Sequence, residues 1–549
     1  MQATMMNFPL TLTHVFERAG RLFPETEIVS RMPDRSLRRL RYADFYSRAQ
    51  GLIGALRKLG VKRGDRVATL MWNHHAHLEA YFAVPCMGAV LHTLNLRLSP
   101  EDIAYIANHA GDRILIVDDV LLPLYEKFRA AAKFEKVIVV PLSGAAVAKE
   151  HENYERLVEK GRAVKLPDLK EEAPAGMCYT SGTTGRPKGV VYTHRSLVLH
   201  SLASALPDVM AIGHHDTITP VVPMFHVNAW GIPFTAVMAG AKIVFPGPHL
   251  DAVSLLDLYQ DEQVTLTAGV PTIWGGILQA LDQEPGRWKL TPGMRMVVGG
   301  AAAPESMIRA FDRHHLRVIH GWGMTETSPA AAVNYVKRGV DSLGADEQYA
   351  LRAKQGVPLP FVEARVMAGE REVPWDGATM GELEVRGPWI AASYHDLESE
   401  TDKWSADGWF RTGDVVTMDA RGYIKITDRI KDLVKSGGEW ISSLDLENAL
   451  VGHPKVAEAA VIAVPDAKWG ERPLAVVVLK AGQSATQDEL RDYLAPKFAK
   501  FWLPDGYAFV DAIPRSSTGK MLKASLREQF RDYMRANNPG PGSAPAPGR

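Results

Sequence analysis

One stretch rich in glycine and hydroxyl side chains constrains this chain more than any other part of its sequence. It covers residues 179–189 and reads Tyr-Thr-Ser-Gly-Thr-Thr-Gly-Arg-Pro-Lys-Gly, followed by an apolar run at residues 190–192. Glycine lets successive backbone N–H groups converge on one anion, while the hydroxyls, Arg186 and Lys188 add donors and positive charge. The stretch therefore predicts a loop that holds a polyphosphate.

This loop differs from the Walker A phosphate loop, which ends in a Gly-Lys-Ser or Gly-Lys-Thr triplet. Here Lys188 follows Pro187 and precedes Gly189. The sequence therefore predicts a phosphate loop of another kind. A flexible surface turn is the alternative, because the same residue types dominate ordinary loops.

The length and charge of the chain limit its class. With 549 residues it is too long for one hydrophobic core, and roughly three or four domain-sized units are expected. Lys and Arg together number 63, as do Asp and Glu, so the net charge is zero. This balance argues against a nucleic-acid-binding protein that uses a broad basic face.

Cysteine content and hydropathy favour a cytoplasmic protein. The two cysteines, Cys86 and Cys178, are too few for a disulfide framework or a cysteine metal site, which fits a reducing compartment. Residues 1–10 lack a basic region followed by an apolar one, so we expect no signal peptide. The most apolar window, residues 229–241, contains Pro233 and Thr235 and suits a buried segment better than a membrane span.

Alternating helix and strand patterns predict an α/β fold for the first two thirds of the chain. Apolar residues at helical spacing predict a helix over residues 45–59 that ends at Gly60, and a second helix is expected at residues 196–206. A short strand is expected to end within residues 221–226, so that His226 lies at its carboxyl end. Continuous apolar runs of the buried parallel type predict strands at residues 113–117 and 136–140, and further strands are expected at residues 66–71, 264–267 and 294–298.

The pattern changes after about residue 356. Short alternating segments with turns, such as residues 381–387, predict a small β-barrel that extends to residue 428. A final α/β piece follows, and we place a domain boundary near Lys431. Residues 537–549 are rich in Pro, Gly, Ser and Ala and predict a disordered tail. The final piece is expected to contain strands at residues 459–464 and 474–479 and a helix at 488–494.

Two further motifs offer a carboxylate beside a glycine turn. Residues 321–327 read Gly-Trp-Gly-Met-Thr-Glu-Thr, where the glycines admit a flat ligand and Glu326 offers a ligand for Mg²⁺. Residues 408–414 read Gly-Trp-Phe-Arg-Thr-Gly-Asp, and an acidic side chain after such a turn commonly grips ribose hydroxyls. An ordinary loop and an Asx-turn are the respective structural alternatives.

Two charged motifs lie near the C-terminus. Residues 428–438 alternate in charge, which more often makes a solvated face than a binding site. Residues 514–523 place Lys520 on a loop rich in serine, threonine and glycine. Such a lysine is more often solvated than catalytic, unless another domain delivers it to an anion.

In this order and spacing the five motifs resemble those of the adenylate-forming superfamily of acyl-CoA synthetases, nonribosomal-peptide adenylation domains and luciferases. The resemblance covers almost the whole chain, up to about Lys523. Residues 223–231 (Pro-Met-Phe-His-Val-Asn-Ala-Trp-Gly) and 435–443 (Lys-Ser-Gly-Gly-Glu-Trp-Ile-Ser-Ser) are similar to bacterial medium-chain fatty acyl-CoA ligases and methylmercaptopropionate–CoA ligases.

The resemblance implies a fold of two parts. Residues 1–430 would form a large N-terminal domain with two α/β layered subdomains and a small β-barrel. Residues 431–536 would form a small, mobile α+β domain that carries Lys520, with Lys431 at the hinge and residues 537–549 as a tail. Rotation about the hinge would withdraw Lys520 after the first half-reaction and present residues 436–438 to the CoA thiol.

The resemblance also implies an ATP-dependent acid–CoA ligase that uses ATP, Mg²⁺ and CoA. Catalytic roles would fall to Lys520, Glu326, Thr325 and His226, and metal contacts to Thr184 and Glu326. The acid would contact His226, Val227, Trp230, Gly231, Gly299 and Gly300. ATP and CoA would contact Thr180, Ser181, Gly182, Thr183, Thr184, Lys188, Gly300, Ala301, Ala302, His320, Gly321, Trp322, Gly323, Met324, Asp414, Ile426, Arg429, Lys435, Ser436, Gly437, Gly438, Glu439 and Trp440.

The implied mechanism follows from charge. A carboxylate has to attack an anionic α-phosphate, so Mg²⁺ and Lys520 reduce the repulsion and stabilise the charge that develops. The loop that ends at Lys188 would hold the β- and γ-phosphates, and Asp414 and Arg429 would hold the ribose. Water has to be excluded while the mixed anhydride waits for CoA.

The residues expected to line the acyl pocket indicate an apolar monocarboxylic acid, such as a medium-chain fatty acid. Val227, Trp230, Gly231 and Gly299 are apolar or small, and none offers a charge to the α-ammonium group of an amino acid. His226 is similar to the aromatic gate between acyl pocket and thiol tunnel. The chain length of the acid does not follow from the sequence.

Three alternatives stay open at this point. An acyl-AMP ligase that loads a carrier protein would carry an insertion at the start of its C-terminal domain, and none is visible. A luciferase-like oxygenase shares the adenylate chemistry. A nucleotide-binding scaffold without activity would lose its catalytic positions first, yet Lys520, Glu326, Asp414 and Lys188 are all present.

Three histidines at residues 74, 75 and 77 suggest a metal site. A solvent-exposed loop or helix start is favoured, because no carboxylate or cysteine accompanies them at ligand spacing. His320 stands where similar proteins carry tyrosine or another polar residue, which leaves its adenine contact open. Among partners we expect the acid, ATP and CoA but neither nucleic acid nor an integral membrane segment, and dimers among similar proteins favour a homodimer.

Overall fold

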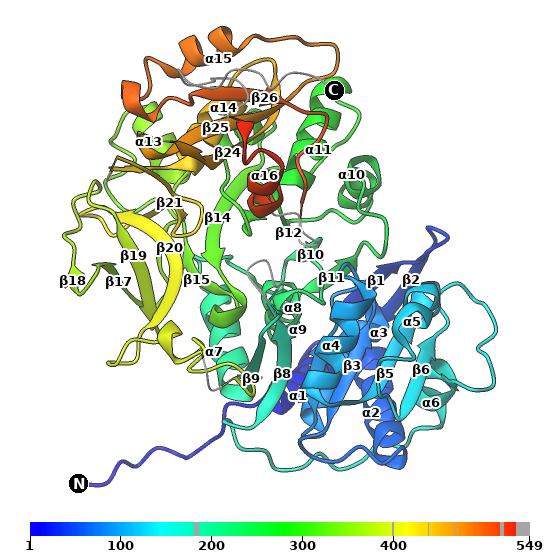
Figure 1. Cartoon of the computed structure of the whole chain (residues 1–549). Helices are drawn as coiled ribbons and strands as arrows, with labels where there is room; N and C mark the ends of the chain where they lie inside the picture. Colours follow the sequence, from blue (N-terminus) through cyan, green and yellow to red (C-terminus); the bar gives the residue numbers. More distant parts are fainter. Residues whose placement is uncertain (181–185, 398–399, 438, 467, 516–520, 534–549) are drawn as a thin grey trace, which may run out of the picture. The chain divides into compact units, whose positions relative to one another are not determined.

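A computed structural model describes residues 1–180, 186–397, 400–437, 439–466, 468–515 and 521–533. The chain forms two compact units, Met1–Glu363 with Val385–Phe410, and Ala364–Glu384 with Arg411–Arg549. Figure 1 shows their helices and strands coloured along the sequence. This division groups the small sheet with the C-terminal residues, whereas the boundary near Lys431 groups it with the larger domain, so that boundary stays a prediction.

The first unit contains a nine-stranded sheet whose centre is parallel. Strands at both ends of the order, β2 and β15–β16, pair antiparallel with their neighbours. In spatial order the strands are β16 (Val357–Pro358), β15 (Ala330–Val333), β14 (Arg317–Gly323), β13 (Arg295–Val298), β12 (Leu266–Gly269), β10 (Thr217–Pro220), β11 (Lys242–Phe245), β1 (Glu27–Arg31) and β2 (Leu37–Arg41).

A seven-stranded sheet in the same unit ends in an antiparallel hairpin, β8–β9. Its other neighbours pair in parallel, as the continuous apolar runs predict. The strand order is β7 (Glu152–Asn153), β6 (Lys136–Val140), β5 (Asp112–Asp118), β3 (Arg66–Leu70), β4 (Val90–Thr93), β8 (Pro174–Tyr179) and β9 (Gly189–Thr193).

Helices alternate with these strands along the chain. The helix predicted to end at Gly60 is confirmed as α2, and within the described residues no helix combines the length and apolar character needed to span a bilayer. The helical segments of this unit are α1 (Leu12–Leu22), α2 (Tyr42–Lys58), α3 (His75–Cys86), α4 (Pro100–Ala110), η1 (Asp119–Leu121), α5 (Leu122–Phe128), α6 (Tyr154–Lys160), α7 (His194–Ala205), α8 (Val227–Trp230), α9 (Ile232–Ala239), α10 (Ala252–Asp261), α11 (Pro271–Gln283), α12 (Glu305–Arg313), η2 (Thr325–Thr327), α13 (Ala345–Arg352) and η3 (Thr401–Lys403).

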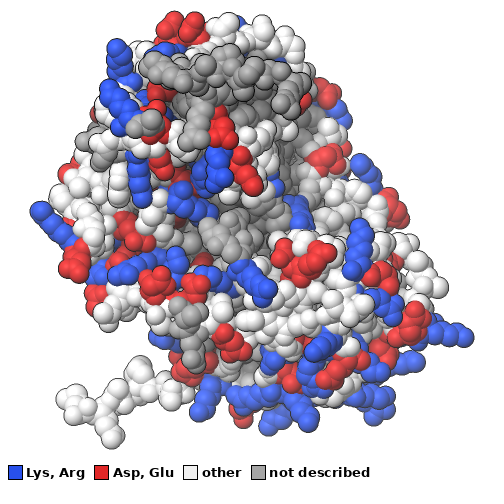
Figure 2. Space-filling model, in the orientation of Figure 1, with Lys and Arg blue, Asp and Glu red and all other residues white. Residues whose placement is uncertain are grey.

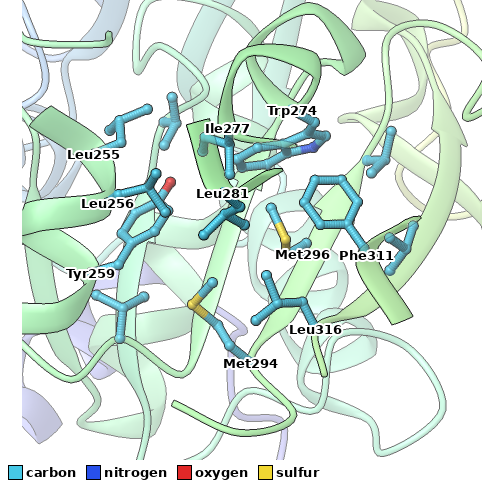
Figure 3. Packing of buried hydrophobic residues seen from close by; sticks show 14 of the residues in the cluster. Leu255, Leu256, Tyr259, Trp274, Ile277, Leu281, Met294, Met296, Phe311 and Leu316 are labelled. Atoms are coloured by element: carbon cyan, nitrogen blue, oxygen red, sulfur yellow. The ribbon is translucent and has the colours of Figure 1, made fainter. Parts of the chain in front are cut away.

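A large apolar cluster joins α10, α11 and α12 to the nine-stranded sheet. Trp274 of α11 and Phe311 of α12 are completely buried beside Met296 of β13 (Figure 3). Burial of aromatic side chains of this size is a major source of stability. The cluster fixes β13, whose carboxyl end leads into the glycines at residues 299 and 300.

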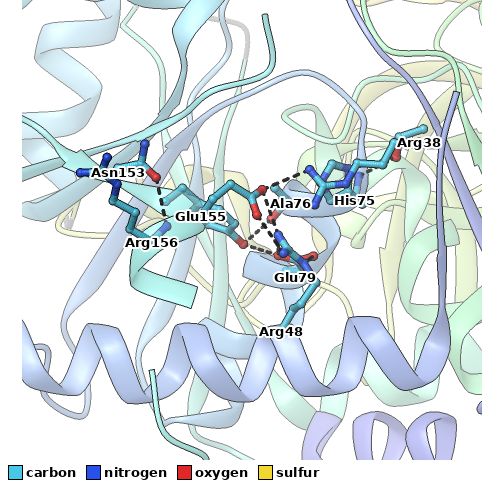
Figure 4. Close-up of polar contacts among 10 residues, drawn as sticks. Arg38, Arg48, His75, Ala76, Glu79, Asn153, Glu155 and Arg156 are labelled. Atoms are coloured by element: carbon cyan, nitrogen blue, oxygen red, sulfur yellow. Dashed lines mark hydrogen bonds and ion pairs between the residues drawn. The ribbon is translucent and has the colours of Figure 1, made fainter. Parts of the chain in front are cut away.

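A buried network of ion pairs ties three helices of the first unit, α2, α3 and α6, to one another. Arg48 of α2 donates from Nε to Oε1 of the fully buried Glu79 at 2.7 Å, and from Nη1 to Glu155 at 2.9 Å (Figure 4). Tyr154 Oη donates to the other oxygen of Glu79 at 2.6 Å. Burial raises the pKa of Glu79 and opposes the effect of Arg48. These bonds satisfy a carboxylate that would be costly to bury alone.

The second unit contains two smaller sheets and three α-helices among its described residues. The segment predicted as a small barrel forms a five-stranded sheet, in which β17–β18 and β20–β21 are antiparallel pairs. Its order is β18 (Arg371–Glu372), β17 (Glu363–Ala368), β19 (Gly381–Arg386), β20 (Phe410–Met418) and β21 (Ile424–Arg429). The remaining elements are β22 (Val434–Ser436), β23 (Glu439–Ile441), α14 (Ser443–Val451), β24 (Val456–Asp466), β25 (Gly470–Leu479), α15 (Gln487–Leu494), η4 (Lys500–Trp502), β26 (Gly506–Phe509) and α16 (Lys523–Gln529).

Acidic and basic side chains are interspersed over the face of the protein that Figure 2 shows. This mixture agrees with the equal totals of the two charge types in the sequence. Salt-screened attraction between such exposed charges contributes little to stability.

Candidate active site

The predicted phosphate loop connects the antiparallel strands β8 and β9. Tyr179 pairs with Gly189, and Thr180 N–H donates to Lys188 O at 2.9 Å. Lys188 N–H donates in turn to the Thr180 hydroxyl at 3.0 Å. Thr180 and Lys188 therefore close the base of the loop, whereas Ser181, Gly182, Thr183 and Thr184 lie outside the described residues.

One face of α4 supports both ends of this loop. The Tyr179 hydroxyl lies 2.7 Å from His109 Nδ1, and the Arg186 guanidinium lies 5.0 Å from the centre of the Tyr105 ring. Residues 105 and 109 are four apart and share one side of the helix. Gly189 is needed opposite them, because an added Cβ would lie 2.9 Å from Cζ of Tyr179.

The second motif holds Glu326 at a fixed place beside this hairpin. Glu326 is buried, its backbone oxygen accepts from Ala391 N–H at 2.8 Å, and its Oε1 accepts from the Tyr394 hydroxyl at 2.6 Å. Thr325 O accepts from the Tyr192 hydroxyl of β9 at 2.8 Å. The structure thereby brings the predicted catalytic residues Thr325 and Glu326 to the strand that follows the phosphate loop.

Tyr394 links the predicted metal carboxylate to the predicted phosphate-loop cation. Its ring centre lies 5.2 Å from Lys188 Nζ, and its hydroxyl binds Glu326. Lys188 also forms an ion pair with Glu400. Burial, and then the Glu326 carboxylate, raise the pKa of Tyr394, so the phenol stays protonated and donates.

The chain turns sharply between β13 and α12, where Gly300 has a φ of 77°. His320 supports this turn from β14: Ala303 N–H donates to its Nε2 at 3.4 Å, and its Nδ1 lies 3.0 Å from Ala353 O. Burial lowers the pKa of His320 to about 4, so the imidazole is neutral. The adenine contacts of His320 and of residues 300–302 stay predictions.

Glycines in β14 allow a close approach of backbone to backbone. An added Cβ at Gly323 would lie 1.9 Å from Pro329 O, so no larger residue fits. Trp322 pairs with Ala332, and Gly321 with Val333, on β15. Met324 N–H donates to the Thr327 hydroxyl at 2.8 Å, which shapes the turn that carries Glu326.

The prediction that a strand ends within residues 221–226 is wrong, because β10 already ends at Pro220. The N–H groups of Val221 and Val222 both donate to Ala268 O at 3.0 Å, so the chain leaves the regular ladder there. Asn73 then holds the segment: its Nδ2 donates to Pro220 O and Val222 O, each at 2.9 Å, and its Oδ1 accepts from Met224 N–H at 2.7 Å.

Four consecutive residues after His226 adopt a left-handed conformation. Residues 227–230, with φ between 43° and 58°, form α8, and Gly231 continues the turn at 73°. Left-handed backbone costs roughly 1–2 kcal/mol for each non-glycine residue, so packing has to enforce it. Val227 and Trp230 are buried, and Trp230 Cη2 would lie 3.0 Å from a Cβ at Gly299. The structure thus brings together Trp230 and Gly299, both predicted to contact the acid.

Steric crowding explains why residue 231 is a glycine. A Cβ there would lie 2.7 Å from His200 Nδ1. His200 Nε2 accepts from Ala330 N–H at 3.1 Å, and burial lowers its pKa to about 4. A neutral imidazole therefore separates the left-handed turn from β15.

In the second unit, the two residues predicted to hold ribose face each other. Asp414 pairs with Arg429 on β20 and β21, and Arg429 Nε lies 3.1 Å from Asp414 Oδ1. Ile426 pairs with Val416 on the same strands. Lys431, the predicted hinge, follows two residues after Arg429, and burial lowers its pKa.

The residues predicted to bind CoA form the β22–β23 hairpin, in which Lys435 pairs with Trp440 and Ser436 with Glu439. The Ser436 hydroxyl accepts from Arg472 Nη1 at 3.0 Å. Gly437 has a φ of 60°, and its N–H donates to Trp469 O at 2.8 Å. Gly438 lies outside the described residues. The hairpin therefore brings together the predicted CoA contacts at residues 435–437, 439 and 440.

Lys520 also lies outside the described residues, but the chain on both sides of it is anchored. Arg515 and Met521 form a β-bridge, and Leu522 N–H donates to Pro514 O at 2.8 Å. The Lys523 side chain is 11% exposed, with its Nζ 2.6 Å from both Glu447 Oε1 and Ser443 Oγ. Burial raises the pKa of Glu447 to about 7 and opposes the effect of Lys523.

The expectation of a solvent-exposed histidine cluster is wrong. His75 begins α3, as a helix start predicts, but His74, His75 and His77 are all buried. A carboxylate does accompany them, because His74 Nε2 lies 2.9 Å from Asp118 Oδ1. Asp118 comes from β5 and is distant in sequence, which is why local spacing does not reveal it. Within the described ranges, no cluster of three or more His, Cys, Asp or Glu side chains is arranged to hold a metal ion.

Comparisons with known proteins match nearly the whole chain. The family described as AMP-binding enzyme matches residues 16–395, and its C-terminal domain matches residues 445–520. The chain belongs to the AMP-binding enzyme family. It is 52% identical over 538 residues to a long-chain-fatty-acid–CoA ligase of Thermus thermophilus, and the aligned region covers 97% of each chain.

Further comparisons agree with this family membership. A 3-methylmercaptopropionyl-CoA ligase of Ruegeria lacuscaerulensis is 44% identical, over 97% of this chain and all of that one. The crystal structure of ATP-bound MatB from Rhodopseudomonas palustris has a TM-score of 0.81 at 27% identity, and covers 96% of this chain and 100% of that chain.

Membership confirms the expectations that the resemblance carried. The adenylate-forming α/β fold, the AMP-forming acyl-CoA synthetase activity through an acyl-adenylate, and the use of ATP and CoA are confirmed, whereas the use of Mg²⁺ stays a prediction. The roles of individual residues within this member of the AMP-binding family stay predictions.

Three residues of the site escaped the sequence analysis. Tyr394 is 68 positions from Glu326, Asn73 is 151 from Met224, and Glu400 pairs with a lysine of the phosphate loop. None belongs to a motif that contains its partner. Contacts in space, rather than spacing in the sequence, identify them. Tyr394 and Glu400 both lie beside Lys188, and Asn73 accepts from Met224 N–H.

Proposed function

We propose that this acyl-CoA synthetase activates a medium-chain or other apolar fatty acid. The observation that carries the proposal is the buried left-handed turn at residues 227–230, where Trp230 packs against Gly299. No cation or carboxylate occurs among the predicted acid contacts to bind a second polar group. The two relatives are named for a long-chain fatty acid and for 3-methylmercaptopropionate, so an apolar acid of adjustable length suits both.

The side chains of the phosphate site fit Mg²⁺ and ATP in their chemistry. Glu326 offers a fixed, buried carboxylate, and carboxylate and phosphate oxygens are the ligands that Mg²⁺ prefers. Bound there, Mg²⁺ would neutralise phosphate charge. Lys188 would hold the β- and γ-phosphates, Lys520 would stabilise the charge on the α-phosphate during attack by the acid, and Tyr394 would keep Glu326 oriented.

Activity with a series of straight-chain acids tests the proposed substrate. The ratio kcat/KM should rise from short acids to an optimum near medium length, because each buried methylene gains about 0.8 kcal/mol until the pocket is full. Benzoate and 3-methylmercaptopropionate belong in the same series. A preference for an amino acid or a dicarboxylate would contradict the proposal.

The two half-reactions are proposed to need rotation of residues 431–536 about Lys431. Proline fixes φ near −65° and removes the N–H, so Lys431→Pro should impair thioester formation while leaving adenylation largely intact. Pyrophosphate release and acyl-CoA formation from added acyl-adenylate report the two steps separately. Equal loss in both steps would show that Lys431 is not a hinge.

We further propose that the protein is a cytoplasmic homodimer. Met1, Met5, Met6 and Phe8 are exposed, and the segment that carries them projects from its unit (Figure 1). Exposed apolar side chains on such a segment can be covered by a partner chain. Both cysteines are free and buried, which suits a reducing compartment. Light scattering of the full chain tests the dimer, and a monomer at micromolar concentration would contradict it.

A further inference from the structure

The Lys188 ammonium already has an anionic partner. It pairs with the Glu400 carboxylate, and the two side chains are 23% and 29% exposed. The ring of Tyr394 lies on the ammonium as well, at 5.2 Å. A partly buried pair of this kind is less screened by salt than a surface pair.

The segment that precedes Glu400 is fixed to the phosphate site. Ala391 N–H donates to Glu326 O at 2.8 Å, the Tyr394 hydroxyl donates to Glu326 Oε1 at 2.6 Å, and His395 N–H donates to Gly189 O at 2.9 Å. These three bonds tie the segment to both the carboxylate motif and the strand after the phosphate loop. The Glu400–Lys188 pair is therefore part of the site.

We propose that Glu400 competes with the polyphosphate of ATP for the Lys188 ammonium and thereby sets the affinity for ATP. The inference rests on the proposed role of Lys188 toward the β- and γ-phosphates. If a phosphate oxygen approaches this ammonium, two anions share one cation and repel each other. The polyphosphate carries more charge than a single carboxylate, so Glu400 leaves the ammonium and ATP takes its place.

A comparison of how three ligands bind distinguishes this competition from other effects of Glu400. ATP and pyrophosphate both carry the phosphates that Lys188 would hold, whereas AMP lacks them. Removal of the Glu400 charge should therefore strengthen binding of ATP and pyrophosphate and leave AMP unaffected. If Glu400 instead positions Lys188 for the phosphates, its removal should weaken binding of ATP.

The experiment measures Kd by calorimetry for Mg²⁺–ATP, Mg²⁺–pyrophosphate and AMP on the full chain without acid, so that no turnover occurs. For Glu400→Gln we expect Kd for ATP and pyrophosphate to fall about 1.5- to fivefold, the range that corresponds to ion-pair contributions measured at exposed sites. Glu400→Asp retains the charge, so its Kd values for ATP and pyrophosphate should stay closer to those of the unaltered protein. Glu284→Gln is a matched control, because it removes a carboxylate paired with Arg287 elsewhere in the same unit.

The outcomes distinguish this inference from the proposed function. An unchanged or raised Kd for ATP in Glu400→Gln, or an equal shift for AMP, would overturn the inference. Tyr394→Phe retains the ring on Lys188 but loses the bond to Glu326, so it should not reproduce the tighter ATP binding. If the unaltered protein bound AMP and not ATP, the proposed function would fall together with the inference.

Discussion

Replacement of Lys520 by alanine is expected to lower the rate of acyl-adenylate formation about 10²–10³-fold, the range for loss of one charge-stabilising donor in a transition state. The reason is that two anions, the carboxylate and the α-phosphate, have to meet, and the proposed role of Lys520 is to stabilise the charge that develops between them. Single-turnover release of pyrophosphate measures this step. Acyl-CoA formation from added acyl-adenylate should change little.

A matched control uses a lysine of the same unit outside the proposed machinery. Lys497 interacts with the Tyr493 ring at 3.6 Å, and Lys497→Ala should leave both half-reactions unchanged. Equal loss in the two half-reactions of Lys520→Ala would show a structural defect instead. Full adenylation activity in that variant would remove Lys520 from the first step.

Lowering the pH from 7 to 4 is expected to destabilise the first unit strongly. Burial lowers the pKa of His194, His200 and His320 to about 4 and that of His77 to about 3, from 6.5. Because the folded-state pKa is depressed, the contribution of each histidine is complete above pH 6.5 and is lost as the pH falls toward 4. Between pH 7 and pH 4 the resulting loss of stability is about 3 kcal/mol for each histidine.

Thermal unfolding between pH 7 and pH 4 tests this expectation. The midpoint temperature of unfolding should fall steeply below pH 6.5. The midpoint of His200→Gln should fall less, because glutamine cannot take up the proton yet can accept from Ala330 N–H. His215→Gln, at an exposed position, is the control and should follow the unaltered chain. A midpoint independent of pH over this range would contradict the account.

Sequence periodicity predicts the regular elements of this enzyme because burial dictates them. The apolar runs at residues 113–117 and 136–140 are central parallel strands, β5 and β6, and a strand buried on both faces needs such a run. Dense motifs also predict local geometry: the glycine-rich stretch at residues 179–189 begins at the last residue of β8 and ends at the first residue of β9, and these two residues pair. Asp414 and Arg429, predicted from separate motifs, face each other on one pair of strands.

Other features depend on contacts that a local pattern does not encode. The left-handed turn at residues 227–230 contains four non-glycine residues, all of them buried, and Trp230 packs on Gly299. His74 is buried because Asp118, from β5, supplies its partner. Tyr394 meets Glu326 for the same reason, as tertiary structure joins segments that no spacing rule relates.

The central claim is that this protein activates an acid as an adenylate and then transfers the acyl group to CoA. The most direct test is pyrophosphate release from Mg²⁺–ATP with octanoate, measured with and without CoA. We expect release to require octanoate, and CoA to raise turnover while acyl-CoA and AMP form in equal amounts. Pyrophosphate release that CoA does not accelerate, without any thioester, would contradict the claim and favour transfer to a carrier protein.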